Sequence, residues 1–210
     1  MALAYQTFVM YSDVMPARGD HDARRRVVSQ AVWRVLASEG FGGLTMRAVA
    51  AELGASTGLV THYFPSKQAL IRHAVELAEE HTRIRNRHPY DKEGLEGLRA
   101  ALLDVMPLTP EAASMNRVWV SFWGEALSDE SLGDFEVRRY ERWRGMLRPH
   151  VEAAVESGEL PKETGVDDLV ATAAAFAHGL VVQALVDPAR FPPSRQAALV
   201  DQFIERLAGP

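Results

Sequence analysis

Apolar residues along this chain recur at intervals of three and four, the spacing that places them on one face of an α-helix. The first such repeat runs from Asp22 to Glu39, and Gly40 marks its end. Its apolar members are Val27, Val28, Ala31, Val32, Val35 and Leu36. No sustained alternation of apolar and polar residues, the signature of a strand, lies between turn residues. The pattern therefore predicts an all-α protein.

Two short helices separated by a glycine turn are predicted next. Thr45 can cap the first, which ends at Gly54, and Ser56 can cap the second, which continues through His62. Two short amphipathic helices joined in this way are what a helix-turn-helix requires. The polar face of the second helix would enter a major groove with short side chains: Ser56, Thr57, Gly58, Thr61 and His62.

A long fourth helix, which Ser66 can cap, is predicted to continue until Pro89. Five further helices are expected at Glu93–Met106, Glu111–Leu127, Glu130–Ser157, Val166–Val186 and Pro193–Leu207. We divide the chain into a helix-turn-helix DNA-binding domain at residues 21–67 and a larger helical domain at 68–210, expected to bind a ligand and to dimerise. Residues 1–20 are expected to be a disordered arm, or the result of a start codon placed too far upstream.

Charge differs between these parts. The whole chain has a net charge of −5, yet residues 17–67 have seven basic and four acidic side chains. Their excess of basic residues suits phosphate contacts, whereas the acidic remainder argues against a protein that coats nucleic acid indiscriminately.

Composition narrows the chemistry further. The chain has no cysteine, which excludes disulfides, thiolate metal sites and cysteine nucleophiles, and its seven histidines are scattered, so we expect no metal and no cofactor. We find no secretory signal and no apolar run long enough for a membrane span; the most apolar stretch is Leu169–Val186. A soluble cytoplasmic protein is expected.

The segment LTMRAVAAELGASTGLVTHYFPSKQAL, residues 44–70, resembles the TetR family of bacterial regulators. The resemblance implies that Thr45 and Arg47 contact one phosphate strand of DNA and that Tyr63 and Lys67 contact the other. The chemistry agrees independently, because a tyrosine hydroxyl and a lysine ammonium both donate hydrogen bonds to phosphate.

Several assignments near the recognition helix stay open. Which of Thr57, Gly58, Val60 and Thr61 reads bases is undetermined, and Val60 can belong to the core or to the interface. Phe64 is expected in the core. Arg24 to Arg26 are interpreted as a solvated charge run with a sequence-independent supporting role at most.

The segments WVSFWGEAL, RRYERWRGML and AFAHGLVVQALVDP, within residues 118–188, resemble the C-terminal domain of the BetI-like branch of this family, whose namesake responds to choline. Aromatic residues at helical spacing here are either core or the wall of a pocket for a cationic or apolar ligand. The candidate ligand-binding residues are Trp119, Phe122, Trp123, Tyr140, Trp143 and His178. Glu125 and Glu141 either balance a ligand ammonium or lie on the surface.

The last two helices are rich in alanine, and the resemblance implies that they pair with a second copy in a homodimer. We expect a regulator of a palindromic operator in double-stranded DNA that responds to a small-molecule effector, with repression favoured and activation left open. The alternatives are an enzyme and a helical adaptor that binds protein. The sequence contains no convergent catalytic set, phosphate loop or cofactor fingerprint to support the enzyme.

Overall fold

The structure, a computed structural model, describes residues 21–85 and 92–208, and every regular element in those ranges is an α-helix. The expected all-α fold is confirmed. The first four helices are α2 (His21–Gly43), α3 (Met46–Glu52), α4 (Thr57–Tyr63) and α5 (Lys67–Arg85). The others are α6 (Gly94–Asp104), α7 (Pro110–Ala126), α8 (Glu130–Glu156), α9 (Val166–Val186) and α10 (Pro193–Ala208). The predicted arm at residues 1–20 lies outside the described residues.

Two of the three N-terminal helix caps expected from the sequence form side-chain hydrogen bonds. The Ala48 N–H donates to Thr45 Oγ1 at 3.1 Å, and the Ala69 N–H donates to Ser66 Oγ at 3.1 Å. Ser56 occupies the position before α4, but its exposed hydroxyl makes no capping hydrogen bond. The prediction that Ser56 caps this helix is therefore wrong for its side chain.

The helix α2 changes direction at Gly40, where φ is +68°. Residues other than glycine rarely adopt this backbone conformation. Phe41 follows this turn directly. Phe41 is fully buried, and its N–H donates to Ser121 Oγ on α7 at 3.0 Å. The end of α2 is thus fixed to the larger domain.

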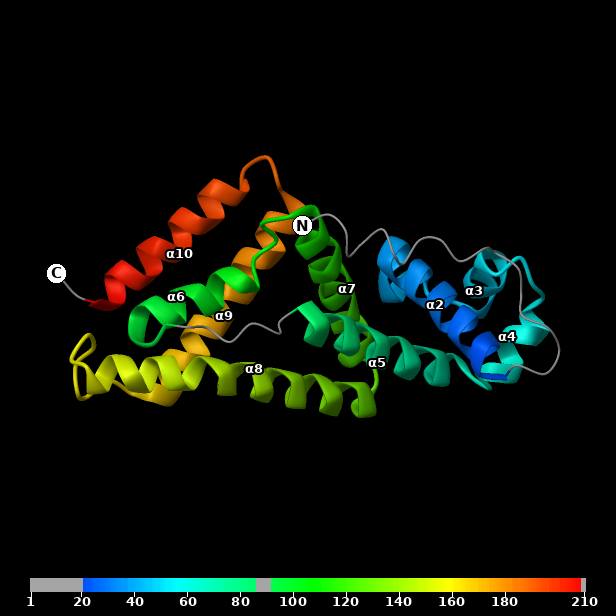
Figure 1. The fold of residues 1–210 in the computed structure, drawn as a ribbon, viewed down its shortest axis with the longest axis horizontal. Coiled ribbons are helices and arrows are strands. Elements are labelled where there is room, and N and C mark those ends of the chain that lie inside the picture. Colours follow the sequence, from blue (N-terminus) through cyan, green and yellow to red (C-terminus); the bar gives the residue numbers. More distant parts are fainter. Residues whose placement is uncertain (1–20, 86–91, 209–210) are drawn as a thin grey trace.

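Two apolar cores hold the helices together. The first contains residues of α2, α3, α4 and α5, and also Val118, Trp119 and Phe122 of α7. The second joins α6, α9 and α10 to the C-terminal part of α8. Figure 1 shows α2, α3 and α4 at one end of an elongated molecule and α6, α9 and α10 at the other, with α5 and α7 between them. The division of the chain into two domains after Lys67 remains a prediction. The first core contains residues from both sides of this boundary.

The helix α9 is long and apolar enough to cross a membrane by length and composition, with a mean hydropathy of 1.9 over its most apolar window. The expectation that no segment reaches that length is therefore wrong. Eight of its residues are buried in the second core or beside it, which is how the central helix of a globular domain packs.

Candidate nucleic-acid interface and ligand cavity

The helix pair α3 and α4 separates its residues into a buried and an exposed set. Val49, Ala50 and Val60 are at most 3% exposed and pack in the first core with Phe64. The burial of Val60 assigns it to the core, the question that the sequence left open. Gly54 makes the turn between the helices with φ at +61°.

The predicted DNA-contacting residues lie on the other side of these helices. All are exposed except Tyr63, which is partly buried: Thr45, Arg47, Ser56, Thr57, Gly58, Thr61, His62 and Lys67. The Thr61 hydroxyl donates to the Thr57 carbonyl oxygen at 2.9 Å, so its own proton is already used within α4. The ring of His62 lies edge-on to that of Tyr63, with centroids 5.4 Å apart.

Lys67, at the start of α5, has an acidic neighbour from the larger domain. Its Nζ is 3.8 Å from Oε1 of Glu125 on α7. Glu125 therefore lies at the junction of the two parts of the chain and does not line the cavity around Trp119 and Trp123, although the sequence left a ligand role open for it. A phosphate approaching Lys67 would compete with that carboxylate.

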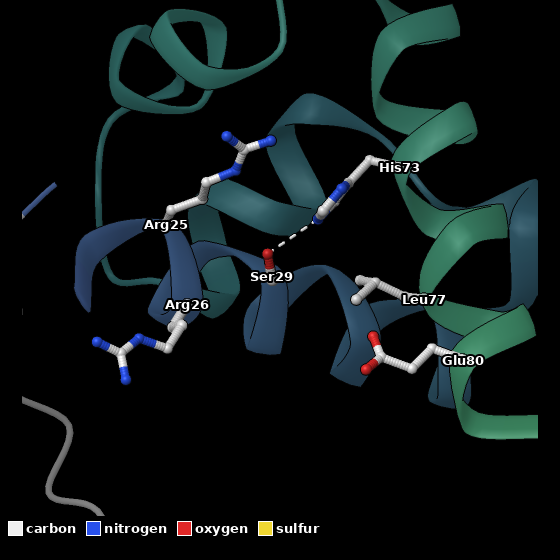
Figure 2. A pocket seen from close by; sticks show the side chains of 6 residues that line it. All are labelled: Arg25, Arg26, Ser29, His73, Leu77 and Glu80. Carbon is white, nitrogen blue, oxygen red and sulfur yellow. Dashed lines mark hydrogen bonds between the residues drawn. The ribbon is translucent and has the colours of Figure 1, made fainter. Parts of the chain in front are cut away.

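A polar cleft of about 550 Å³ lies between α2 and α5 (Figure 2). Ser29 Oγ and His73 Nε2 are 2.9 Å apart across it, and Arg25 extends over the same side while Arg26 points away. Burial lowers the pKa of His73, which favours the neutral ring. Arg25 and Arg26 border this cleft and are both exposed, as expected for a solvated charge run.

A larger cavity of about 730 Å³ opens between α5, α7, α8 and α9, with Val105 at the end of α6 beside it. Four of the six predicted ligand-binding residues line it together: Trp119, Trp123, Trp143 and His178. Tyr140 stands next to it, with its ring centroid 4.9 Å from that of His178. The fold therefore brings together aromatic residues of α7 and α8 and His178 of α9, which the sequence had named as candidates.

Phe122 is the exception. It is fully buried in the first core, where its ring lies 4.9 Å from that of Phe41, and it does not line the cavity. Trp119 and Phe122 are three residues apart on α7, so both face inward, but α2 covers Phe122 and α8 leaves space beside Trp119. We therefore assign Phe122 to packing.

One charged pair was not predicted from the sequence: Arg139, which lines the cavity, and Glu136, which lies behind it and does not. Arg139 Nε and Nη2 donate to Glu136 Oε2 and Oε1 at 2.7 and 2.6 Å, and Trp123 Nε1 donates to the same Oε1 at 3.0 Å. The guanidinium carbon of Arg139 lies 4.3 Å from the ring centroid of Trp119 and 5.0 Å from that of Tyr140. Glu136 and Arg139 stand three apart on α8, a spacing visible in the sequence but common on helix surfaces.

Acidic residues enter the cavity from α5. Glu76, Glu79 and Glu80 line it, and Glu79 forms an ion pair with Arg142 of α8. Glu141, for which the sequence left a ligand role open, is exposed and does not line it.

Burial controls the protonation of the ring side chains near the cavity. Burial, with Arg139 nearby, lowers the pKa of His178 to about 4, so the ring is neutral near pH 7. Burial and then the charge of Glu136 raise the pKa of Tyr140 to about 12. Within residues 21–85 and 92–208, no group of three or more acidic or histidine side chains could hold a metal ion.

Comparison with known proteins links both regions to one family. Residues 30–74 match the model for bacterial regulatory proteins of the tetR family, and residues 94–209 match the model for the C-terminal domain of BetI-type transcriptional repressors. The HTH-type transcriptional regulator PksA of Bacillus subtilis is 28% identical over 92% of this chain and 94% of its own length. The regulator BetI of Burkholderia lata is 30% identical over 56% of this chain and 62% of its own length.

Solved structures show the same fold. A protein of Saccharomonospora viridis, described as a transcriptional regulator and solved in complex with choline, superposes with a TM-score of 0.72 at 22% identity. The alignment covers 87% of this chain and 96% of that one.

Proposed function

Since the chain belongs to the TetR family of bacterial regulatory proteins, with a C-terminal domain of the BetI type, we propose that it is a repressor that a small-molecule effector releases from a palindromic operator. TetR-family proteins are transcriptional regulators and not enzymes. We place this one in the cytoplasm, where its operator would be.

The observation that carries the DNA-binding proposal is the division of α3 and α4 into two faces. Val49, Ala50 and Val60 are buried, while the candidate contacts on and beside these helices, apart from Tyr63, are exposed. In this proposal Thr45, Arg47, Tyr63 and Lys67 hold phosphates, and the exposed residues of α4 reach the base edges.

The cavity supports the effector proposal. Its volume falls within the range that small ligands occupy, and three tryptophans line it with acidic residues from α5. This lining suits a cation, and choline, which the Saccharomonospora viridis protein contains, is the first compound to test. Repression is released if the ligand binds better to the conformation that cannot bind DNA, with a coupling of about 1 to 3 kcal/mol.

The helix α5 is the proposed connection between the two sites. It begins at Lys67, on the DNA-binding surface, and carries Glu79 and Thr82 in the cavity wall. In a homodimer, a shift of α5 in each copy would change the separation of the two recognition helices, which must match successive major grooves about 34 Å apart.

Fluorescence anisotropy with duplexes from the region upstream of the gene tests DNA binding. We expect sequence-selective binding that weakens with salt, and Tyr63→Phe and Lys67→Ala should weaken binding to all sequences alike. Lys67→Ala should also reduce the dependence of log K on log salt by about one unit. Glu125→Gln is the matched control, because it removes the partner of Lys67 and leaves the ammonium in place.

Glu125→Gln should bind DNA at least as tightly as the unmodified protein. If neither Tyr63→Phe nor Lys67→Ala changes affinity, the phosphate contacts are misassigned. If no duplex in a genomic selection binds selectively, the repressor proposal is wrong and the protein-binding adaptor becomes the better interpretation.

A further inference from the structure

The guanidinium group of Arg139 is surrounded by the kinds of side chain that bind an organic cation. Its guanidinium lies against the faces of Trp119 and Tyr140 and shares two hydrogen bonds with Glu136. Aromatic faces around a positive group, closed by a carboxylate, form the kind of subsite that binds organic cations in proteins. In this cavity the chain's own side chain fills that subsite.

We propose that Arg139 is the resident occupant of a cation subsite formed by Trp119, Tyr140 and Glu136, and that an effector with a cationic head group binds by displacing it. The inference rests on the proposed effector function and adds which side chain the effector replaces. It also makes Arg139 a determinant of affinity, because every cationic ligand competes with it.

The burial of Glu136 explains why the subsite selects a cation. Glu136 is only 6% exposed, and besides Arg139 it accepts a hydrogen bond from Trp123 Nε1, which is uncharged. A buried carboxylate that loses its charged partner is strongly unfavourable, so Arg139 leaves only when another positive group arrives. A neutral ligand can fill the space beside Trp143 and His178 and leave the pair intact.

The same cavity contains alternative partners for the displaced guanidinium. Glu76, Glu79 and Glu80 line it from α5, opposite the α8 position of Arg139. A guanidinium that moves toward them exchanges a contact within α8 for one between α8 and α5. Displacement would therefore act on the helix that begins at Lys67, which connects the occupied cavity to the DNA-binding surface.

A structural role for the pair makes the opposite prediction. If Arg139 only fastens α8 to α7, its replacement should loosen the cavity and weaken binding of every probe. If it occupies a cation subsite, its replacement should vacate that subsite and strengthen the binding of small cations.

The test is a titration of the full-length protein with methylguanidinium and tetramethylammonium chlorides, followed by tryptophan fluorescence. Arg139→Gln keeps an amide that can donate to Glu136 and removes the charge. We expect it to bind both probes on the order of tenfold more tightly than the unmodified protein. Arg138→Gln, at an exposed arginine of α8 that does not line the cavity, is the matched control and should change neither affinity.

Adding Glu136→Gln to Arg139→Gln should abolish the gain. If Arg139→Gln does not fold, Arg139→Lys replaces it, because the ammonium lacks the planar fork and should give a smaller gain in the same direction. Equal or weaker binding after the Arg139 substitution overturns the inference.

Anisotropy with operator DNA separates this inference from the proposed function. A gain in probe affinity without any release of DNA supports the subsite and contradicts release by a cationic effector. Release of DNA by tetramethylammonium from the unmodified protein, with no gain in Arg139→Gln, supports the function and overturns the subsite.

Discussion

The indole Nε1 of Trp119 donates a hydrogen bond to Oγ1 of Thr82, 2.9 Å away. Trp119 belongs to α7 and the cavity wall, whereas Thr82 lies near the end of α5. The Thr82 hydroxyl in turn donates to the carbonyl oxygen of Ala78 at 2.9 Å, so both partners are satisfied. This bond fixes α5 to the wall that a ligand would contact.

Thr82→Val should lower the free energy of unfolding by about 1 to 2 kcal/mol, because it leaves a buried indole N–H without a partner. Thr82→Ser keeps the hydroxyl and is the matched control. Urea unfolding of Thr82→Val, Trp119→Phe and the double variant gives the interaction energy, which we expect to be about 1 kcal/mol. Additive effects would show that the bond contributes nothing in solution.

Local signals made the helices predictable. The range Val166–Val186 was predicted as observed, because apolar periodicity and the turn residues on both sides are encoded within the segment itself. The Thr45 cap was also predictable, since the donor N–H is three residues along the chain. Ser56 shows the limit of this reasoning, because residue type identifies a capping position without fixing where the hydroxyl points.

Contacts between distant helices were harder to predict. Periodicity placed Trp119 and Phe122 on one face of α7, but only the position of α2 decides that Phe122 is core and Trp119 is cavity wall. The sequence left a ligand role open for Glu125 and Glu141, but the acidic residues that line the cavity come from α5, because the crossing of α5 with α8 is not encoded in either helix alone. The pairing of Arg139 with the Trp119 ring depends on the same kind of tertiary contact.

Gly40→Ala should destabilise the protein more than Gly54→Ala. Both glycines have positive φ, so each substitution introduces backbone strain of about 1 to 2 kcal/mol. A Cβ at Gly40 would also lie 2.8 Å from Ser121 Oγ, whereas nothing lies within 4 Å of one at Gly54. Urea unfolding measures both effects, and an equal loss in the two variants would mean that the contact between α2 and α7 relaxes without cost.

Stability should decrease below neutral pH, partly because of His178. Its pKa is lowered to about 4 from 6.5, so the unfolded chain binds a proton below about pH 6.5 that the folded chain does not. The stabilisation is complete above that pH and is lost as the pH falls toward 4. The charged groups that influence its pKa are Arg139, Glu136 and Arg144, all on α8.

The free energy of unfolding should fall by about 1 kcal/mol between about pH 7.5 and 5.5 through His178 alone. His73, His81 and His150 also have pKa values lowered by burial, so they add to the slope. His178→Gln should therefore reduce the pH dependence of urea unfolding without removing it. An unchanged slope in this variant would mean that the ring is not desolvated in solution.

The exposed face of α9 provides the test of the homodimer. Thr172, Ala175, Gly179 and Val186 recur at helical spacing along it, and Val186 is 80% exposed. Small side chains in such a stripe allow a second helix to approach closely, as pairing with a second copy would require.

Gly179→Arg should convert the dimer to a monomer in sedimentation velocity and weaken operator binding by more than about tenfold, because a single reading domain loses the contribution of the second half-site. Gly145→Arg is the matched control. Gly145 is also an exposed helical glycine at which a Cβ would meet nothing within 4 Å, but it lies on α8. It should leave both the dimer and DNA binding unchanged. A Gly179→Arg protein that sediments as a dimer would place the interface elsewhere, and a monomeric unmodified protein would contradict the two-fold mechanism itself.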